Sequence, residues 1–234
     1  MHDLGILSRN TTIAHSVWVS EEDIEKMGDA RCSVAHNAIS NQKLGAGIAH
    51  ARQLLNAGVA IGLGTDGVSS NDTARIFDVM RVAGLFHSVS GPDQTQWIRA
   101  DEILTMATIG GARSAMLENV TGSLEIGKAA DLLIIDLTTL SFTPLNDIAK
   151  HLVYSENGSS IETVMVAGEI VLDRGVMRKI DEAAILAEIR ELVPAHLAEH
   201  AKFEQRNAAF HSTMAEIHCL ATAKDIGMSR YLKN

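Results

Sequence analysis

Residues 59–71, VAIGLGTDGVSSN, decide the fold of this chain. The stretch starts with a short apolar run that ends abruptly at residues 64–67, GTDG, and a polar loop and a helix are expected after it. An apolar run of this length, closed by glycines, is typical of a fully buried strand in a parallel sheet. Such sheets carry their working residues just beyond the carboxyl ends of the strands, where Asp66 stands. Asp66 is therefore a candidate metal ligand or general base, and its alternative role is to cap the helix that follows.

The composition limits the function classes that fit. The chain has 234 residues, of which 46% are hydrophobic, and this is enough to bury the core of one large domain or one and a half. A net charge of −9 without a basic run makes nucleic acid and anionic membranes poor partners. The apolar stretches are far shorter than a membrane span, and no signal peptide is expected. Cys32 and Cys219 lack CxxC spacing, which favours free thiols in a reducing cytoplasm.

Strands and helices are expected to alternate up to residue 88. We predict strands over residues 11–19, 32–36 and 59–65 and helices over residues 20–28, 47–57 and 72–88. This order is that of a parallel sheet or barrel. The three strands end in His15, His36 and Asp66. One histidine at a strand end is more often structural, but three polar endings in succession indicate a shared site that binds a metal or moves a proton.

The character of the sequence changes near residue 120. A helix is expected over residues 101–117, and the part that follows is rich in turns and strands, with a strand over residues 132–137 and a hairpin over residues 161–172. A long helical pattern with a break at Pro194 then covers residues 181–210, and a further helix is expected after it. We therefore divide the chain into residues 1–120, 121–178 and 179–234.

Three motifs, read in order, resemble the amidohydrolase superfamily. His15 in IAHSV matches the alanine–histidine pair that ends barrel strand six in the branch of cytosolic deaminases and chlorohydrolases. Residues 36–41, HNAISN, match the HNPxSN stretch after strand seven, except that alanine replaces proline. Residues 64–67, GTDG, match strand eight without change. Members of this branch act on adenosine derivatives, guanine-like bases and s-triazines.

The resemblance implies an α/β fold that is the C-terminal part of a TIM-type (β/α)8 barrel. Strands six to eight and their helices would fill residues 1–120. Residues 122–136 resemble the family's link into a small β-sandwich beside the barrel, and the stretch from residue 151 resembles the closing strands of that sandwich. C-terminal helices would complete the chain.

The resemblance also implies a reaction, the hydrolysis of a carbon–nitrogen bond on a purine-like or triazine-like ring. In the family the strand-eight aspartate, here Asp66, binds a divalent metal and takes a proton from metal-bound water, whose pKa the metal lowers. Zinc is the expected metal and iron the alternative. The strand-six histidine, here His15, orients or polarises the substrate, a small heterocyclic amine. Ser70 matches a serine that contacts substrate, while His36 has either a substrate contact or a structural role in its loop.

One departure from the family pattern is large. Family members carry a metal-binding HxH on strand one and a further histidine ligand on strand five, and this chain contains no HxH. A zinc ion normally needs three or four protein ligands, and three strands cannot close an eight-stranded barrel. We expect one of three explanations: a truncated chain that is inactive alone, one half of a split enzyme, or a non-catalytic binding or assembly remnant that forms a homo-oligomer over its open sheet edges.

Overall fold

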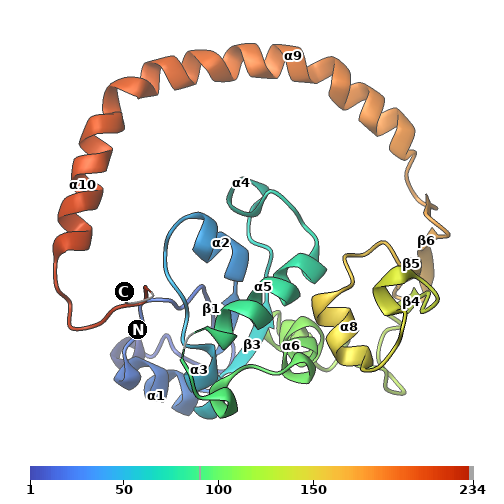
Figure 1. Cartoon of the computed structure of the whole chain (residues 1–234), viewed down its shortest axis with the longest axis horizontal. Coiled ribbons are helices and arrows are strands. Elements are labelled where there is room, and N and C mark those ends of the chain that lie inside the picture. Colours follow the sequence, from blue (N-terminus) through green and yellow to red (C-terminus); the bar gives the residue numbers. More distant parts are fainter. Residues whose placement is uncertain (90, 232–234) are drawn as a thin grey trace. The chain divides into compact units, whose positions relative to one another are not determined.

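The computed structural model describes residues 1–89 and 91–231 (Figure 1). Contacts between residues divide the chain into two units. The first unit is Met1–Gly175 together with the described residues 230 and 231, and the second is Val176–Ser229. Each unit is described by itself.

A three-stranded parallel sheet forms the centre of the first unit. Its strands are β1 (Thr12–Ala14), β2 (Ser33–His36) and β3 (Ala60–Leu63), paired in the order β1-β2-β3. The strands run parallel, so their carboxyl ends meet at one edge of the sheet. Val34 and Ile61 are fully buried, as expected for strands that are covered on both faces.

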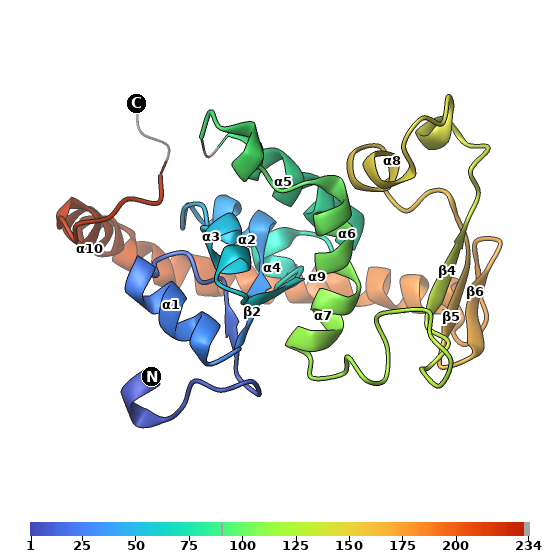
Figure 2. The same cartoon turned by 90° about the horizontal axis from the view of Figure 1, so that it is seen from below.

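Helices follow each strand and surround the sheet (Figure 2). The helices of the first unit are α1 (Glu21–Asp29), α2 (Ala38–Lys43), α3 (Ala51–Asn56), α4 (Val68–Asn71), α5 (Ile76–Ser88), α6 (Ala100–Ala107), α7 (Ile109–Ser114) and α8 (Ile148–Tyr154), with short 3-10 turns η1 (His2–Leu4), η2 (Gln94–Gln96) and η3 (Leu140–Phe142). Helix α1 starts at a capping box, because the Ser20 side chain accepts from the Asp23 amide while Asp23 accepts from the Ser20 amide.

Several elements differ from the expected ones. The first strand is only three residues long, because His15 and Ser16 adopt left-handed backbone conformations with φ of +63° and +50°. The helix expected over residues 101–117 is two helices, α6 and α7, since Thr108 has φ −118° and ψ −100° between them. Most of residues 36–41, the stretch that matches the family motif after strand seven, form helix α2, for which no helix was predicted.

A charged pair joins two of these helices beside the core. The Arg52 guanidinium of α3 donates to both carboxylate oxygens of Glu102 in α6, at 2.9 and 2.7 Å, and also to the Trp97 carbonyl oxygen at 2.8 Å. Both side chains are largely buried, so the bidentate geometry matters more than it would at the surface. Leu54 and Ile103, which are fully buried, lie in the apolar core that these helices enclose.

Glycines allow α7 to pack directly on β3. A Cβ atom at Gly110 would lie 2.2 Å from the Ile61 carbonyl oxygen, and one at Gly62 would lie 2.9 Å from the Gly111 Cα. Such distances are shorter than any ordinary packing contact, so the helix and the strand touch backbone to backbone. A Cβ at Gly111, by contrast, would meet only the Met106 carbonyl oxygen at 3.7 Å.

An antiparallel sheet forms the rest of the first unit. Strands β4 (Leu132–Ile135), β5 (Ile161–Val166) and β6 (Glu169–Asp173) are neighbours in sequence order. The β5–β6 hairpin turns at Ala167 and Gly168, both with positive φ, as the sequence predicted from the tight turn at these residues.

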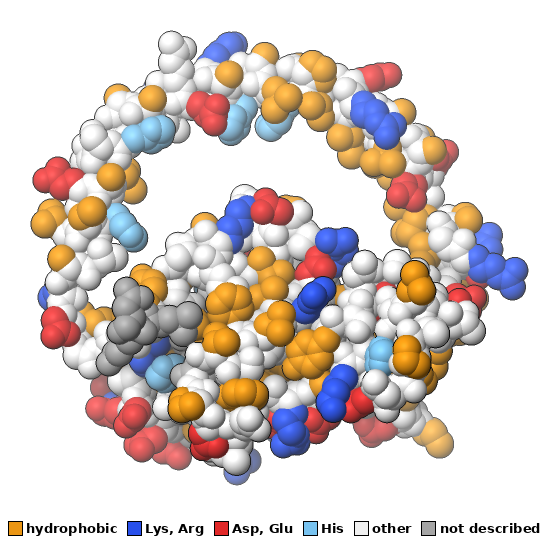
Figure 3. Space-filling model, viewed as in Figure 1, with side chains coloured by type: hydrophobic (Ala, Val, Ile, Leu, Met, Phe, Trp, Pro, Cys, Tyr) orange, Lys and Arg blue, Asp and Glu red, His pale blue; other side chains and the backbone are white. Residues whose placement is uncertain are grey.

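The second unit is almost entirely helical. It contains β7 (Val176–Met177), the long helix α9 (Glu182–Asn207), the turn η4 (Ala208–Phe210) and α10 (His211–Ala223). The predicted break at Pro194 is wrong, because α9 continues through this proline. None of the residues in α9 or α10 is buried, and apolar side chains such as Ile189 and Leu192 are exposed. Figure 3 shows hydrophobic side chains at the surface of these helices. Among the described residues, no helix is both long and apolar enough to cross a membrane.

The two glycines of α7 give a matched test of this packing. We expect Gly110→Ala to lower the free energy of unfolding by about 1–3 kcal/mol, because its methyl group would overlap the Ile61 carbonyl. Gly111→Ala should leave stability unchanged or raise it by about 0.5–1 kcal/mol, since alanine is the better helix former and has room. Urea unfolding of both variants measures the difference, and equal effects would contradict the backbone contact.

Candidate functional site

The carboxyl ends of the three parallel strands form the candidate site. Backbone hydrogen bonds continue the pairing past the strand ends, from the His15 amide to the Ala35 carbonyl at 2.9 Å and from the Gly64 amide to the His36 carbonyl at 3.1 Å. This continuation draws the loop after β1 and the loop after β3 toward β2. As a result, His15 Nε2 lies 3.8 Å from Asp66 Oδ2.

Two hydrogen bonds fix the Asp66 carboxylate. The Ser40 hydroxyl donates to Oδ2 at 2.6 Å and the Gly67 amide donates to Oδ1 at 2.7 Å. These bonds, with that from Ser40 the larger influence, lower the pKa of Asp66, so the side chain is an oriented anion at neutral pH. Gly67 holds the N-cap position of α4 and Arg75 that of α5, so Asp66 caps neither helix.

The backbone at Asp66 and His15 is unusual. Asp66 has φ +60° and His15 has φ +63°, in the left-handed region that non-glycine residues seldom adopt. Such conformations persist only where the surrounding contacts determine them, and they concentrate at functional sites. Their presence at both ends of the 3.8 Å contact supports a functional rather than a structural reading of the pair.

Asn41 orients the His15 ring. His15 Nδ1 lies 2.7 Å from Asn41 Oδ1, whereas the Asn37 amide nitrogen is 3.5 Å away. An amide oxygen only accepts, so the shorter contact places the proton on Nδ1 and leaves Nε2 as an acceptor facing Asp66. In the neutral ring, Nε2 and the carboxylate are two acceptors that face each other, which suits a bound hydrogen-bond donor or a cation between them.

Sequence reasoning named residues 36–41 as a motif but missed the separate roles of Ser40 and Asn41. Both side chains are almost fully buried in α2, where they hold Asp66 and His15 respectively. The signal available in the sequence was a pair of short polar side chains a few residues after the middle one of three strands with polar endings.

His36 lies behind the site rather than in it. Its side chain is 3% exposed, and its Nε2 lies 3.1 Å from Nε2 of His87 in α5. Burial is the main cause that lowers the pKa of His36 to about 3 and that of His87 to about 4. Both rings are neutral at pH 7, and this geometry supports the structural alternative for His36.

Ser70 lies on the other side of Asp66, in the short helix α4. Its hydroxyl donates to the Gly67 carbonyl at 3.0 Å and contributes to the lowered pKa of Asp66. Ser70 is thus close to the carboxylate, and its contact with substrate stays a prediction.

The described residues do not make a complete metal centre. Across residues 1–89 and 91–231, no three or more His, Cys, Asp or Glu side chains converge closely enough to hold a metal ion. His15 and Asp66 are two such groups, whereas zinc in proteins takes three or four protein ligands. Within the part of the chain that the structure describes, His15 and Asp66 are therefore too few to hold a zinc ion.

Comparison with known proteins places these features in a family. Residues 1–171 match the model of the Amidohydrolase family. The 5'-deoxyadenosine deaminase of Methanosarcina barkeri is 37% identical over 191 residues, which cover 82% of this chain and 44% of that protein. The 5-methylthioadenosine/S-adenosylhomocysteine deaminase of Thermococcus onnurineus is 41% identical over 175 residues, or 74% of this chain and 41% of that protein.

A solved structure shows the same likeness in three dimensions. The crystal structure of an adenosine deaminase from Xanthomonas campestris with bound zinc superposes with a TM-score of 0.79 at 31% identity, over 82% of this chain and 44% of that one. The chain thus spans less than half the length of the curated relatives it matches.

The hydrogen bond from Ser40 gives the first prediction for this site. Ser40→Ala should raise the pKa of Asp66, because it removes the largest influence that lowers it. Ser70→Ala removes a smaller influence and should raise the pKa less. An NMR titration of the Asp66 carboxyl carbon in both variants measures the order, and a larger shift in Ser70→Ala would contradict the geometry.

The buried histidine pair predicts a dependence of stability on pH. Below pH 6.5, the ordinary histidine pKa, these two histidines bind protons in the unfolded chain but not in the folded state. The free energy of unfolding therefore falls as the pH falls from 6.5 toward 4. Each histidine contributes at most about 1.4 kcal/mol per pH unit. His87→Phe should flatten this slope in urea unfolding between pH 6.5 and 4.5, whereas the exposed control His2→Gln should keep it.

Proposed function

This chain belongs to the amidohydrolase family, and on that premise we propose that it supplies part of the catalytic site of a deaminase. The reaction is the hydrolysis of a carbon–nitrogen bond on a small heterocyclic amine, with an adenosine derivative as the first candidate. The observation that carries the proposal is the oriented Asp66 anion facing His15 Nε2 at 3.8 Å. The choice of a purine over a triazine ring rests on the two curated relatives, which are deaminases of adenosine derivatives.

Each side chain has a proposed role in this reaction. Asp66 accepts a proton from the water that attacks the ring carbon and passes it to the amino group on that carbon, which leaves as ammonia while the hydroxyl group stays on the ring. His15, with its proton on Nδ1, presents Nε2 to the substrate or to the attacking water and fixes its orientation. Ser70 contacts the substrate from the α4 side, and His36 supports the loop from behind.

The divalent metal of the reaction, zinc first and iron as the alternative, would lower the pKa of a bound water. Asp66 is the ligand that this chain would supply, and we propose that the other ligands come from polypeptide outside these 234 residues. The chain alone is then inactive as a deaminase, whether it is part of a longer protein or one half of a split enzyme. We also propose that residues 1–120 are the barrel part, residues 121–178 part of the β-sandwich and residues 179–234 a helical extension. The proposed location is the cytoplasm.

A second function is favoured by one observation on the second unit. None of the residues in its helices α9 and α10 is buried, and exposed apolar side chains recur along α9, including Ile185, Ile189 and Leu192. An exposed apolar helix face of this kind is typical of a surface that binds a partner. A non-catalytic oligomeric binding or assembly module would use this face without Asp66.

Activity of a completed site tests the proposal. The chain, coexpressed with or joined to the complementary part of the M. barkeri relative, should bind zinc and release ammonia from 5'-deoxyadenosine, while the chain alone should not. Asp66→Asn should lower kcat by roughly 10²–10⁴-fold, because it removes the proton acceptor. Asp72→Asn is the matched control, since Asp72 lies in the same segment but pairs with Lys43 at 2.5 Å instead.

Failure of the completed protein to bind zinc and to release ammonia would overturn the deaminase proposal. A stable homo-oligomer of the chain alone, measured by light scattering and disrupted by Ile189→Asp, would support the assembly function. An equal loss of kcat in the Asp66 and Asp72 variants would contradict the assigned role of Asp66 even if the enzyme is active.

A further inference from the structure

Arg230, far from the site in sequence, binds the loop that follows β1. Its Nε donates to the Val17 carbonyl oxygen at 2.8 Å, and its Nη2 donates to the Val19 carbonyl oxygen. The residue is 8% exposed, and burial lowers the pKa of its guanidinium. A buried guanidinium that has given up water needs fixed acceptors, so these two carbonyl groups must stay turned toward it.

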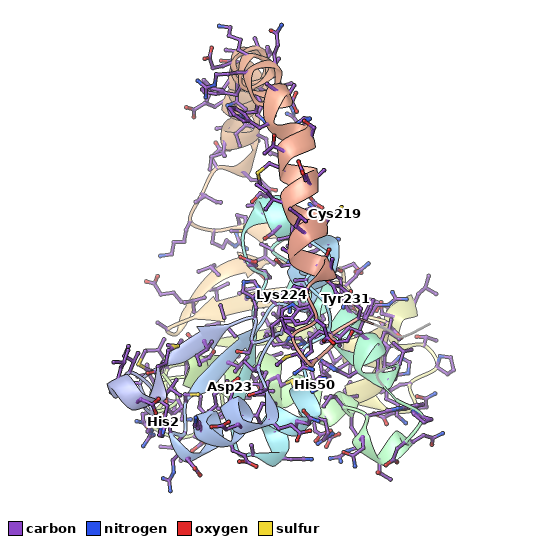
Figure 4. All side chains as sticks on the ribbon, turned by 90° about the vertical axis from the view of Figure 1, so that its left-hand side faces the viewer. His2, Asp23, His50, Cys219, Lys224 and Tyr231 are labelled. Carbon is purple, nitrogen blue, oxygen red and sulfur yellow. The ribbon has the colours of Figure 1, made fainter. Side chains whose placement is uncertain are left out.

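The same short segment also binds the loop between α2 and α3. The Ile48 amide donates to the Arg230 carbonyl oxygen at 2.8 Å, and the Tyr231 hydroxyl donates to the Gly45 carbonyl oxygen at 3.0 Å. Figure 4 labels Tyr231, which belongs to the first unit. A Cβ atom at Gly47 would lie 2.8 Å from the Arg230 carbonyl oxygen, so this glycine allows the close approach of the two backbones.

Trp18 closes the arrangement between the two loops. Its indole Nε1 donates to the Ala46 carbonyl oxygen at 2.8 Å, and its ring meets the Tyr231 ring edge to face, with centroids 5.6 Å apart. We call Arg230 and Tyr231, with the loop residues 17–19 and 45–48 that they bind, the clasp. The clasp thus joins three segments that are far apart in sequence, namely residues 17–19, 45–48 and 230–231.

Both loops of the clasp lead directly to the candidate site. Val17 follows His15 and Ser16, the two residues with left-handed backbone. From the other loop, the Ala46 amide donates to the Asn41 carbonyl oxygen at 2.7 Å, and Asn41 Oδ1 in turn holds His15 Nδ1 at 2.7 Å. The clasp therefore reaches His15 twice, once through the backbone of its own loop and once through Asn41.

We propose that Arg230 is a positioning residue that holds the His15 ring against Asn41 through the clasp. The strained conformation of His15 and Ser16 persists because Arg230 binds the carbonyl groups that follow them. Without the guanidinium, the loop after β1 relaxes and His15 Nε2 no longer faces Asp66 in one orientation. The geometric part of this inference stands by itself, and only its consequence for turnover rests on the proposed function.

Amide hydrogen exchange on the full chain tests the clasp. Arg230→Met keeps an apolar stem and removes the donors, so the loop after β1 loses two hydrogen bonds from a charged group, which are stronger than those between neutral groups. We expect exchange at the His15, Ala46 and Ile48 amides to become at least about tenfold faster, while the Val34 and Ile61 amides of the sheet keep their rates. Arg206→Met is the matched control, because the Arg206 guanidinium lies over the Phe203 ring in α9.

The ¹⁵N spectrum of the His15 imidazole separates positioning from mere stability. The parent chain should show one tautomer with the proton on Nδ1, and Arg230→Met should show a mixture of both. Arg230→Lys keeps the charge but not the two-pronged geometry, so it should restore the single tautomer only in part. An unchanged imidazole spectrum in Arg230→Met, or unchanged exchange in the two loops, would overturn the proposal.

If Arg230→Met unfolds, a milder variant tests the clasp instead. Tyr231→Phe removes only the hydroxyl that binds Gly45 and should speed exchange at Ala46 and Ile48 a few-fold, with the sheet unchanged. No increase there would overturn the clasp. In the completed enzyme, Arg230→Met should lower kcat with little change in KM. A completed enzyme without any activity would refute the deaminase proposal. The exchange rates and the imidazole spectrum would then still decide whether Arg230 positions His15.

Discussion

The hydrogen bond from Ser40 to Asp66 is the interaction on which the candidate site depends, because it joins the helix after β2 to the loop after β3. The neighbouring residue Asn41 makes the corresponding bond to His15, in the loop after β1. Two neighbouring side chains of one helix thus set the positions of both candidate side chains, Asp66 and His15. The parallel register of the strands brings the loops to the same edge, and α2 then fixes the side chains relative to each other.

The chemistry of the site follows from what these bonds leave free. Asn41 takes up the proton-bearing nitrogen of His15, and Ser40 and Gly67 take up one lone pair on each Asp66 oxygen. A ring nitrogen lone pair and a negative charge remain, facing each other at 3.8 Å. The likeness to a zinc-bound adenosine deaminase agrees with such an arrangement of acceptors, while no three candidate ligands converge among the described residues.

Much of the fold and of the candidate site could be predicted from the sequence. The features that could not be predicted have a common cause. The apolar runs with polar endings predicted the parallel strands and the meeting of His15 and Asp66 at one edge of the sheet, because burial and strand ends leave local signals. The early end of β1 at Ala14 and the interruption at Thr108 have no local signal, since backbone angles there are set by tertiary contacts. Pro194 shows the reverse: a strong local breaker lies inside a helix that continues past it.

The clasp also means that the second unit is attached to the first unit at both of its ends. Residues 176–229 leave the first unit after Gly175 and return to it at Arg230, so the second unit is a loop whose two ends are both anchored. The entropic cost of closing a loop grows only with the logarithm of its length, so the anchoring tolerates wide variation in what lies between.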